Sequence, residues 1–434
     1  MTDSGASAQS TGPISLSIIV VSRLRRGHLG FCLMALAAQK RARTEIILVT
    51  DPASLDLRPD LAIKRVPFDE ANISAARNAG IAVASGEVIA FIDDDALALP
   101  GWAERISAPF SDPQVIAATG YTRGPDGFGW QARAERITAA GTTIPVEGVA
   151  TGLNSDTGIY KCPAKDGAPV STIGTNCAFR SASLRQIGGF DPAFRYHLDE
   201  SDVNMRLAQH FPDGLTAIVP QAEVIHGAAA GPVRAQSGVP SDLTQVGRSA
   251  AIFARRHGNS ALLADAMAGL IVSQRKRLLR LMVSGRLDPF RVGPLLAGLK
   301  RGIDRGLETD LPDPPSEPIA PSQSPLLARL DAKAAGRDDQ PHCYLSGWHW
   351  QAARLRRQAA KAVAEGRITY LALWTPSRLP ARLKLAEGGW WEQKSGVFND
   401  LKHRHIGSEQ ANLAGTRRWN MPIHAAFCRK DIAD

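Results

Sequence analysis

The sequence predicts an α/β fold with a mostly parallel central sheet. Short β-branched or apolar runs alternate with helical segments through the first hundred residues, and polar residues follow directly where several of these runs end. In this chain of 434 residues, hydrophobic residues make up 44% and charged residues 21%. That is the composition of an ordinary globular protein, and the length allows two or three domains.

The expected elements follow one another in this alternation. Strands are expected at 16–21, 45–49, 62–66, 88–92 and 222–226, and helices at 30–39, 73–84, 201–209 and 242–257. Pro52 ends the second strand because proline cannot continue a ladder of hydrogen bonds. Gly86 is the expected C-cap of the second helix. Residues 112–172 show little pattern, and we expect them to cross the rim of the site without a chemical role.

Charge and cysteine content limit the classes of function. The five cysteines are dispersed without a Cys-x-x-Cys pair, which favours a reducing compartment over a disulfide framework or a zinc site. Residues 1–13 are polar and small, so we expect a disordered start rather than a secretory signal. The longest apolar runs fall short of the ~18 residues of a membrane span. A net charge of +9 indicates an anionic partner, but the chain has no recognised nucleic-acid-binding motif.

Three consecutive carboxylates mark the clearest candidate site. The apolar run 88–92 ends in Asp93, Asp94 and Asp95. Ligands bind at the carboxyl ends of strands in open α/β sheets, and Mg²⁺ and Mn²⁺ prefer carboxylate oxygens. These acids therefore predict a divalent-metal site. The alternative is a charged loop in which one acid caps a helix near Pro100.

Four segments together resemble the family 2 glycosyltransferases. They are Ile-Ile-Val-Val-Ser-Arg (18–23), Glu-Ile-Ile-Leu-Val-Thr-Asp (45–51), the stretch from Ser74 to Asp95, and the pair Ile173–Asp191 and Leu198–Leu207. Their order and spacing are similar to those of the family over residues 15–231. The resemblance implies the A-type glycosyltransferase fold, in which one half binds the nucleotide and the other binds the acceptor.

The resemblance also implies roles for single residues. Ser22, Asp51, Arg77, Asp93 and Asp94 would contact the nucleotide sugar, with Asp51 accepting a hydrogen bond from a uracil-type base. Thr175 and Asn176 match positions near the transferred sugar, although a simple turn would explain them equally well.

Further matches assign the metal and the catalytic base. Asp95 is the expected direct ligand, with Asp93 and His226 beside it. One acid of the second cluster would deprotonate the acceptor hydroxyl, and Glu200 aligns with that base while Asp199 is the alternative. Asp202, in the same cluster, is expected to cap the helix that follows.

The predicted function is metal-dependent, inverting transfer of a sugar by an enzyme of the hexosyltransferase type. The donor would be a nucleotide-diphosphate sugar, with a UDP-linked donor expected, and the acceptor a glycan or lipid-linked hydroxyl in bacterial surface polysaccharide or glycolipid synthesis. Mg²⁺ or Mn²⁺ is the expected cofactor. Alternatives are a sugar-nucleotide nucleotidyltransferase, which would carry a glycine-rich loop after the first strand, and a non-catalytic sugar- or nucleotide-binding scaffold.

Past the catalytic domain, placed at 14–236, three regions are expected. Residues 237–308 form a basic helical extension, 309–338 a Pro/Ser-rich linker, and 339–434 a small α/β module of unknown role whose tryptophans fit a core better than a sugar-binding surface. The basic helices at 261–306 could lie on an anionic membrane or pack their leucines on the catalytic domain. The expected location is the cytoplasm, with the inner face of the membrane as an alternative.

Overall fold

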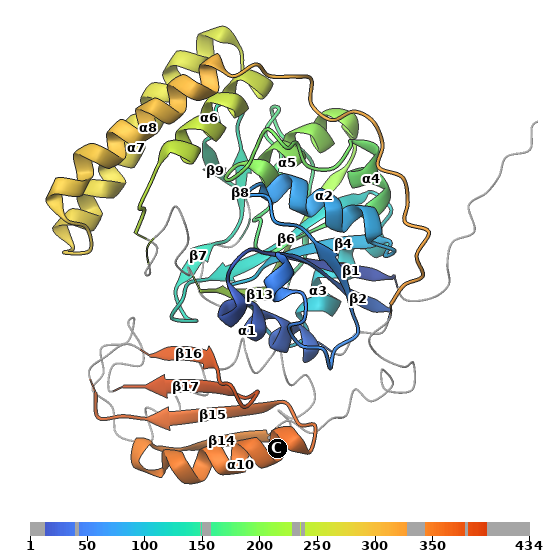
Figure 1. The fold of residues 1–434 in the computed structure, drawn as a ribbon, viewed down its shortest axis with the longest axis vertical. Coiled ribbons are helices and arrows are strands. Elements are labelled where there is room, and N and C mark those ends of the chain that lie inside the picture. The colour runs from blue at the N-terminus through green and yellow to red at the C-terminus, as the bar shows by residue number, and fades with distance from the viewer. Residues whose placement is uncertain are drawn as a thin grey trace, which may run out of the picture.

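The structure is a computed structural model that describes residues 14–39, 43–147, 149, 158–227, 235, 239–327, 343–377 and 381–396. A mixed ten-stranded sheet with helices on both faces forms its centre, and a four-stranded sheet with helix α10 lies beside it (Figure 1). Residues 1–13, predicted to be disordered, lie outside the described residues, as do parts of the predicted linker and C-terminal module. The predicted α/β class is confirmed.

Parallel strands form the first half of the large sheet, in the order β4-β1-β2-β3. The elements are β1 (Leu16–Ser22), α1 (Arg26–Ala37), β2 (Thr44–Thr50), η1 (Pro52–Ser54), β3 (Ile63–Pro67), α2 (Ile73–Val83) and β4 (Val88–Asp93). In the register of β1, Ser22 lies opposite Thr50, and Val21 lies opposite Asp93. The carboxyl ends of the parallel strands therefore meet at one edge, where the polar residues that follow them gather.

The second half of the sheet is mixed. Its elements are β5 (Ala96–Ala98), α3 (Trp102–Ser107), η2 (Ala108–Ser111), β6 (Val115–Arg123), β12 (Cys177–Arg180), α4 (Ser181–Gln186), α5 (Asp199–His210) and β13 (Leu215–His226). Strand β12 runs antiparallel between β4 and β6, and β13 pairs with β6 in parallel. This arrangement brings the start of α5 and the end of β13 towards the edge where β4 ends.

The expectation for residues 112–172 was wrong in part, because this segment contains the central strand β6. All nine of its residues are buried, and it is rich in small side chains. Gly120 has a specific steric role, since a Cβ atom there would lie 1.8 Å from the carbonyl oxygen of Ala222 on β13. The rest of the segment forms short strands: β7 (Trp130–Ala132), β8 (Glu135–Ile137), β9 (Thr143–Pro145), β10 (Tyr160–Cys162) and β11 (Val170–Ser171).

Alternation along the buried strands builds a separate apolar layer on each face of the sheet. On β1, Ile18 and Val20 face the layer that contains Leu33 of α1, whereas Ile19 faces the layer that contains Ala76 of α2. Successive side chains on a strand point to opposite faces, so both faces must be covered. The sheet is thus a rigid support for the polar edge.

The basic extension consists of helices that pack on one another and on the catalytic half. They are α6 (Thr244–His257), α7 (Ser260–Val283) and α8 (Pro289–Glu308). Their apolar side chains share a cluster with Phe194 and Leu198, so the packing alternative explains part of their hydrophobic pattern. Among the described residues, we find no helix that combines the length and apolar character needed to cross a membrane.

The described part of the predicted linker, residues 309–327, is extended but held against the catalytic half (Figure 1). The amide of Ile319 donates to the carbonyl of Arg185 at 3.0 Å, and the amide of Leu327 donates to Glu45 Oε2 at 2.9 Å. A Cβ atom on Gly188 would lie 2.8 Å from Pro315 Cβ. We refer to residues 309–327 as the belt.

The C-terminal module is a four-stranded sheet in the order β14-β15-β17-β16. Its elements are β14 (Cys343–Trp348), η4 (His349–Gln351), α10 (Ala352–Ala364), β15 (Thr369–Trp374), β16 (Arg382–Leu385) and β17 (Trp391–Ser395). The expectation for its tryptophans holds for some of them: Trp374 and Trp391 are buried, but Trp350 is 63% exposed.

Two local expectations were wrong. Gly86 does not cap α2, because the C-cap residue is Ala84, in an extended conformation. Gly86 instead allows close approach to β1, because a Cβ atom there would lie 2.6 Å from the amide nitrogen of Ser17. Asp202 does not cap α5, since it lies inside that helix, forms a buried ion pair with Arg206 at 2.7 Å and contacts His257 Nε2 at 2.9 Å.

Candidate active site

The predicted metal ligands come together at the end of β4. One donor atom from each of Asp93, Asp95 and His226 lies within 4.8 Å of the others. His226 Nε2 is 3.2 Å from Asp95 Oδ1 and 3.8 Å from Asp93 Oδ2. Two carboxylates and one imidazole form a donor set that suits Mn²⁺ or Mg²⁺. The residues present therefore fit the expected divalent cation.

The third acid of the run, Asp94, has a different environment. Ser22 Oγ donates to Asp94 Oδ2 at 2.7 Å, and Arg25 binds Asp94 and Asp95 through its two terminal nitrogens at 2.7 and 2.8 Å. Burial raises the pKa of Asp94 to about 7, although Arg25 and Ser22 oppose the rise. Asp94 thus anchors the loop between β1 and α1 and is not one of the three clustered donors.

Arg77 links the two groups of acids. Its guanidinium on α2 is buried, forms an ion pair with Asp199, and has Nη2 at 3.6 Å from Asp93 Oδ1. The same nitrogen donates to the carbonyl of Gly174 at 3.2 Å. Burial works against the charged form, but Asp199 and Asp93 keep the pKa of Arg77 above its ordinary value. Both acid clusters therefore line the same region.

Glu200 lies beside this link, in the first turn of α5. A Cβ atom on Gly174 would lie 3.3 Å from Glu200 Oε2, so glycine leaves room for the carboxylate. Burial raises the pKa of Glu200 well above its ordinary value; Asp199 adds to the rise and Arg77 opposes it. Leu198, just before the helix, has a φ of 64°, so the chain enters α5 through a left-handed residue.

Thr175 and Asn176 have different environments. Asn176 is fully buried: its Nδ2 donates to the carbonyls of Tyr121 and Ala222 at 3.0 and 2.8 Å, and its Oδ1 accepts from Trp102 Nε1 at 2.8 Å. These bonds use both hydrogens of the amide and tie strands together, so Asn176 has a structural role whether or not it also contacts the sugar. Thr175 is 3% exposed, and its Oγ1 has no hydrogen-bond partner within the described part of the chain.

Asp51 lies at the end of β2, as predicted, with a buried side chain. Its carboxylate accepts from the Leu24 amide at 2.8 Å and from Ser54 Oγ at 3.1 and 3.2 Å. Burial alone would raise its pKa, but these bonds and one from Thr50 lower the pKa below its ordinary value. Asp51 thus remains ionised and shapes the loop that contains Arg25.

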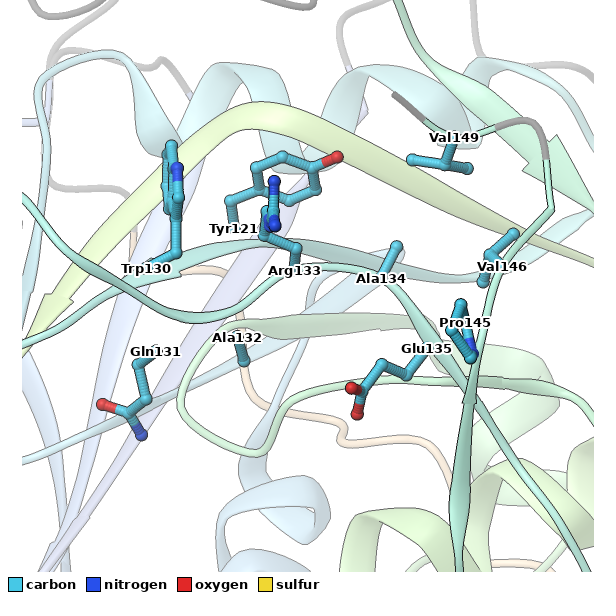
Figure 2. A pocket seen from close by; sticks show the side chains of 10 residues that line it. All are labelled: Tyr121, Trp130, Gln131, Ala132, Arg133, Ala134, Glu135, Pro145, Val146 and Val149. Atoms are coloured by element: carbon cyan, nitrogen blue, oxygen red, sulfur yellow. The ribbon is translucent and has the colours of Figure 1, made fainter. Parts of the chain in front are cut away.

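A cavity of about 310 Å³ lies next to this site, along β7 (Figure 2). Tyr121 and Trp130 meet edge to face with ring centroids 5.4 Å apart, and the Arg123 guanidinium lies 4.2 Å from the Trp130 ring centre. Gln131 points away from these rings, as Figure 2 shows, and its amide meets His226 Nδ1 at 2.9 Å. Alternation along β7 therefore places an aromatic wall on one side and a partner of His226 on the other.

Sequence reasoning missed two residues of the site. Arg25 belongs to the basic loop after the first strand, to which no role was assigned, and its pairing with Asp94 and Asp95 spans about seventy positions. Gln131 lies in the segment to which no chemistry was assigned. The one available signal was the position of Arg25 directly after the first strand, where ligand-binding loops of α/β sheets occur.

Comparison with known proteins gives a family match for the part of the chain that carries the first acid cluster. Residues 17–188, less than half of the chain, match the family described as Glycosyl transferase family 2. The predicted resemblance is confirmed for this segment.

Individual relatives match over shorter stretches or at low similarity. The Bacillus subtilis (strain 168) protein EpsH, described as a putative glycosyltransferase, is 30% identical over 116 residues, which are 25% of this chain and 33% of EpsH. The chain thus matches about a third of the length of that relative.

Among solved structures, the mannosyltransferase PcManGT from Pyrobaculum calidifontis, in complex with GDP-Man and Mn²⁺, shares 16% identity, covers 69% of this chain and 89% of its own, and has a TM-score of 0.42. GalNAc-T7 with UDP, GalNAc and Mn²⁺ shares 16% identity, covers 55% of this chain and 48% of its own, and has a TM-score of 0.38.

Proposed function

We propose that the protein transfers a sugar from a nucleotide-diphosphate sugar, with UDP as the expected nucleotide, to a hydroxyl acceptor, with inversion at the anomeric carbon. The observation that carries this proposal is the position of Arg77 between Asp93 of the first acid cluster and Asp199 of the second. The family match of residues 17–188 supports it.

In the proposed mechanism, Asp93, Asp95 and His226 would hold a Mg²⁺ or Mn²⁺ ion. When bound, that ion would neutralise the diphosphate as a Lewis acid. Gln131, at 2.9 Å from Nδ1, fixes the orientation of the His226 ring. Asp94 and Ser22 hold the loop that carries Arg25, and the guanidinium of Arg25 therefore lies beside the acids.

Glu200 is the proposed base. It accepts the proton of the acceptor hydroxyl, whose oxygen forms the new bond to the anomeric carbon as the bond from that carbon to the diphosphate breaks. The diphosphate leaves with the electron pair. A base within reach of the hydroxyl typically contributes about 10²–10⁴ in rate. Asp199 is less suited to this task, because its carboxylate is committed to Arg77. Thr175 and Asp51 are the proposed contacts of the donor sugar and base.

Donor screening tests the proposal. Purified protein is incubated with Mn²⁺ and a panel of UDP-, GDP- and dTDP-sugars, and released nucleoside diphosphate is measured. A sugar transferase releases the nucleoside diphosphate from the donor. A nucleotidyltransferase would instead join a nucleoside triphosphate to a sugar phosphate and release pyrophosphate. A binding scaffold would retain the donor unchanged. If the protein releases no nucleoside diphosphate from any donor, with or without added glycosides, the proposal is contradicted.

We also propose that residues 261–306 bring the enzyme to an anionic membrane, in keeping with a lipid-linked acceptor in surface polysaccharide or glycolipid synthesis at the inner face. Nine basic residues and three acidic ones lie in this range. At the turn from α7 to α8, Val283 is 83% exposed and Phe290 is 89% exposed. Apolar side chains flanked by basic ones are suited to insertion between anionic headgroups.

The Val283→Ser/Phe290→Ser double variant should bind vesicles containing phosphatidylglycerol about tenfold or more weakly, because two side chains lose apolar burial. Co-sedimentation measures this, with phosphatidylcholine vesicles as the neutral comparison. Trp350→Ser is the matched control, since Trp350 is 63% exposed on the C-terminal module. Equal binding by the double variant and wild type would show that this turn does not enter the membrane.

A further inference from the structure

The C-terminal module forms one wall of a cavity that reaches the metal cluster. The cavity has a volume of about 680 Å³. Phe31 and Asp95 of the catalytic half line one side, and Arg356, Lys384, Trp390 and Glu392 of the module line the other. Pockets of about 300–1,000 Å³ are typical of small-molecule sites. Asp95 is also one of the three proposed metal ligands, so this cavity borders the metal cluster.

Close packing fixes the module in this position. Leu383, Leu385 and Trp391 share an apolar cluster with Leu99 and Ile225 of the catalytic half. The amide of Leu383 donates to the carbonyl of Asp126 at 2.9 Å. Lys384 directly follows Leu383 on β16, so a residue of the cavity wall is held by the interface itself. The wall is therefore part of the packed interface between the ten-stranded sheet and the four-stranded sheet.

Hydrogen bonds also order the wall of the module. Arg356 forms two bonds to the Glu392 carboxylate, at 2.9 and 2.7 Å, and Trp390 Nε1 donates to Glu392 Oε2 at 3.3 Å. Lys384 lies directly opposite Glu392 in the pairing of β16 with β17. The paired guanidinium of Arg356 and carboxylate of Glu392 are both planar, so they offer hydrogen-bond donors and acceptors in fixed directions.

The charges of the lining help to identify the ligand. The acids are Asp95, Glu387 and Glu392, and the basic residues are His28, Arg356 and Lys384. This balance selects neither a simple anion nor a simple cation. It offers hydrogen bonds of both kinds, while Phe31 and Trp390 offer apolar faces, as a neutral ligand rich in hydroxyl groups requires.

We propose that this cavity is a carbohydrate subsite that the C-terminal module completes. The proposal rests on the proposed function and deepens it, because a sugar bound there would lie beside the metal cluster. Two sources share this chemistry: the sugar of the donor, and a sugar of the acceptor. The module thereby takes on a role in substrate recognition.

Two variants of the wall, one double and one single, test the subsite. Lys384 and Glu387 are exposed, so Lys384→Ala/Glu387→Ala should preserve the fold, and Trp390→Leu removes the aromatic face. The matched controls are Lys394→Ala, an exposed lysine on β17, and Trp350→Leu, both outside the cavity. Thermal unfolding and circular dichroism check each protein. Loss of hydrogen bonds to charged side chains should weaken sugar recognition about tenfold.

The assay has two arms, both with Mn²⁺. In the donor arm, calorimetry compares UDP with UDP-glucose, UDP-galactose and UDP-N-acetylglucosamine, and GDP with GDP-mannose. A donor-sugar subsite predicts that the wall variants lose affinity for the nucleotide sugars while their affinity for UDP or GDP stays at that of the controls. In the acceptor arm, methyl glycosides are added during turnover. An acceptor subsite predicts that only the stimulation of nucleotide release by the glycoside is lost.

The outcomes separate the subsite from the enzyme. Wall variants that match the controls in both arms, in a wild-type protein that turns donors over, would overturn the subsite and leave the proposed function standing. Equal loss of UDP and UDP-sugar affinity would also overturn it, since the wall would then act on the nucleotide. Wild-type protein that binds none of the nucleotides would overturn the proposed function, and the subsite with it.

Discussion

Replacing Asp95 with alanine is expected to abolish sugar transfer and Mn²⁺-dependent nucleotide binding while leaving the fold intact. The variant loses the carboxylate that lies 3.2 Å from His226 Nε2. Only two of the three proposed metal ligands, Asp93 and His226, then remain. The loss of affinity should exceed the ~10–100-fold that removal of an outer partner of a metal ligand typically costs. Calorimetry of UDP with Mn²⁺ measures the binding, and circular dichroism checks the fold.

Gln131→Ala provides the graded comparison, because Gln131 contacts His226 but is not one of the three clustered donors. It should retain measurable binding that is weaker than wild type. The same titration in EDTA tests the role of the metal in the wild-type protein. Donor affinity that does not change in EDTA would remove the cation from the mechanism, whatever Asp95→Ala does.

Glu200→Gln is expected to keep donor affinity and lose turnover by about 10²–10⁴-fold, the usual contribution of a general base. Glutamine keeps the size of the side chain beside Gly174 but cannot take a proton. Nucleotide release under saturating donor gives the turnover, and calorimetry gives the affinity. Turnover that survives in Glu200→Gln but fails in Asp199→Asn would move the role of base to Asp199.

The pH dependence distinguishes the two acids further. Burial and the charge of Asp199 raise the pKa of Glu200 above 4.5. A base acts when deprotonated, so activity should fall as the pH drops through this raised value. Asp199→Asn removes one cause of the rise, and its acidic limb should therefore lie at lower pH than that of wild type. An acidic limb that stays in place would contradict the coupling of these two residues.

The sequence predicted those parts of the fold in which local pattern and tertiary structure agree. Strands β1, β2 and β4 are β-branched or apolar runs that end in polar residues, and Asp93, Asp95 and His226 each follow or end a strand. Their convergence follows from the parallel topology. Strand β6 escaped notice because Ala117, Ala118 and Gly120 interrupt its β-branched and aromatic residues, and its pairing depends on β13, about a hundred residues later.

Long-range partners account for the other differences. Asp202 has the residue type and position of a helix cap, but His257, 55 positions away, and Arg206 hold it inside α5. Asn176 was assigned to the sugar because of the family motif, whereas its amide is used by the carbonyls of two strands. Such contacts cannot be found from a single local segment, because the competing partner lies elsewhere in the chain.

The belt has a consequence for dissecting this protein. Residues 309–327 cover Gly188 and Gly189, whose missing side chains make room for Pro315 and Ile319. Arg185 on α4 also loses its bond to the carbonyl of Ala320 if the belt is removed. A truncation after α8 would therefore uncover Gly188 and Gly189 and leave Arg185 without this acceptor. A fragment that ends at Leu327 would keep these contacts, but it would expose Leu99 and Ile225, which pack on the C-terminal module.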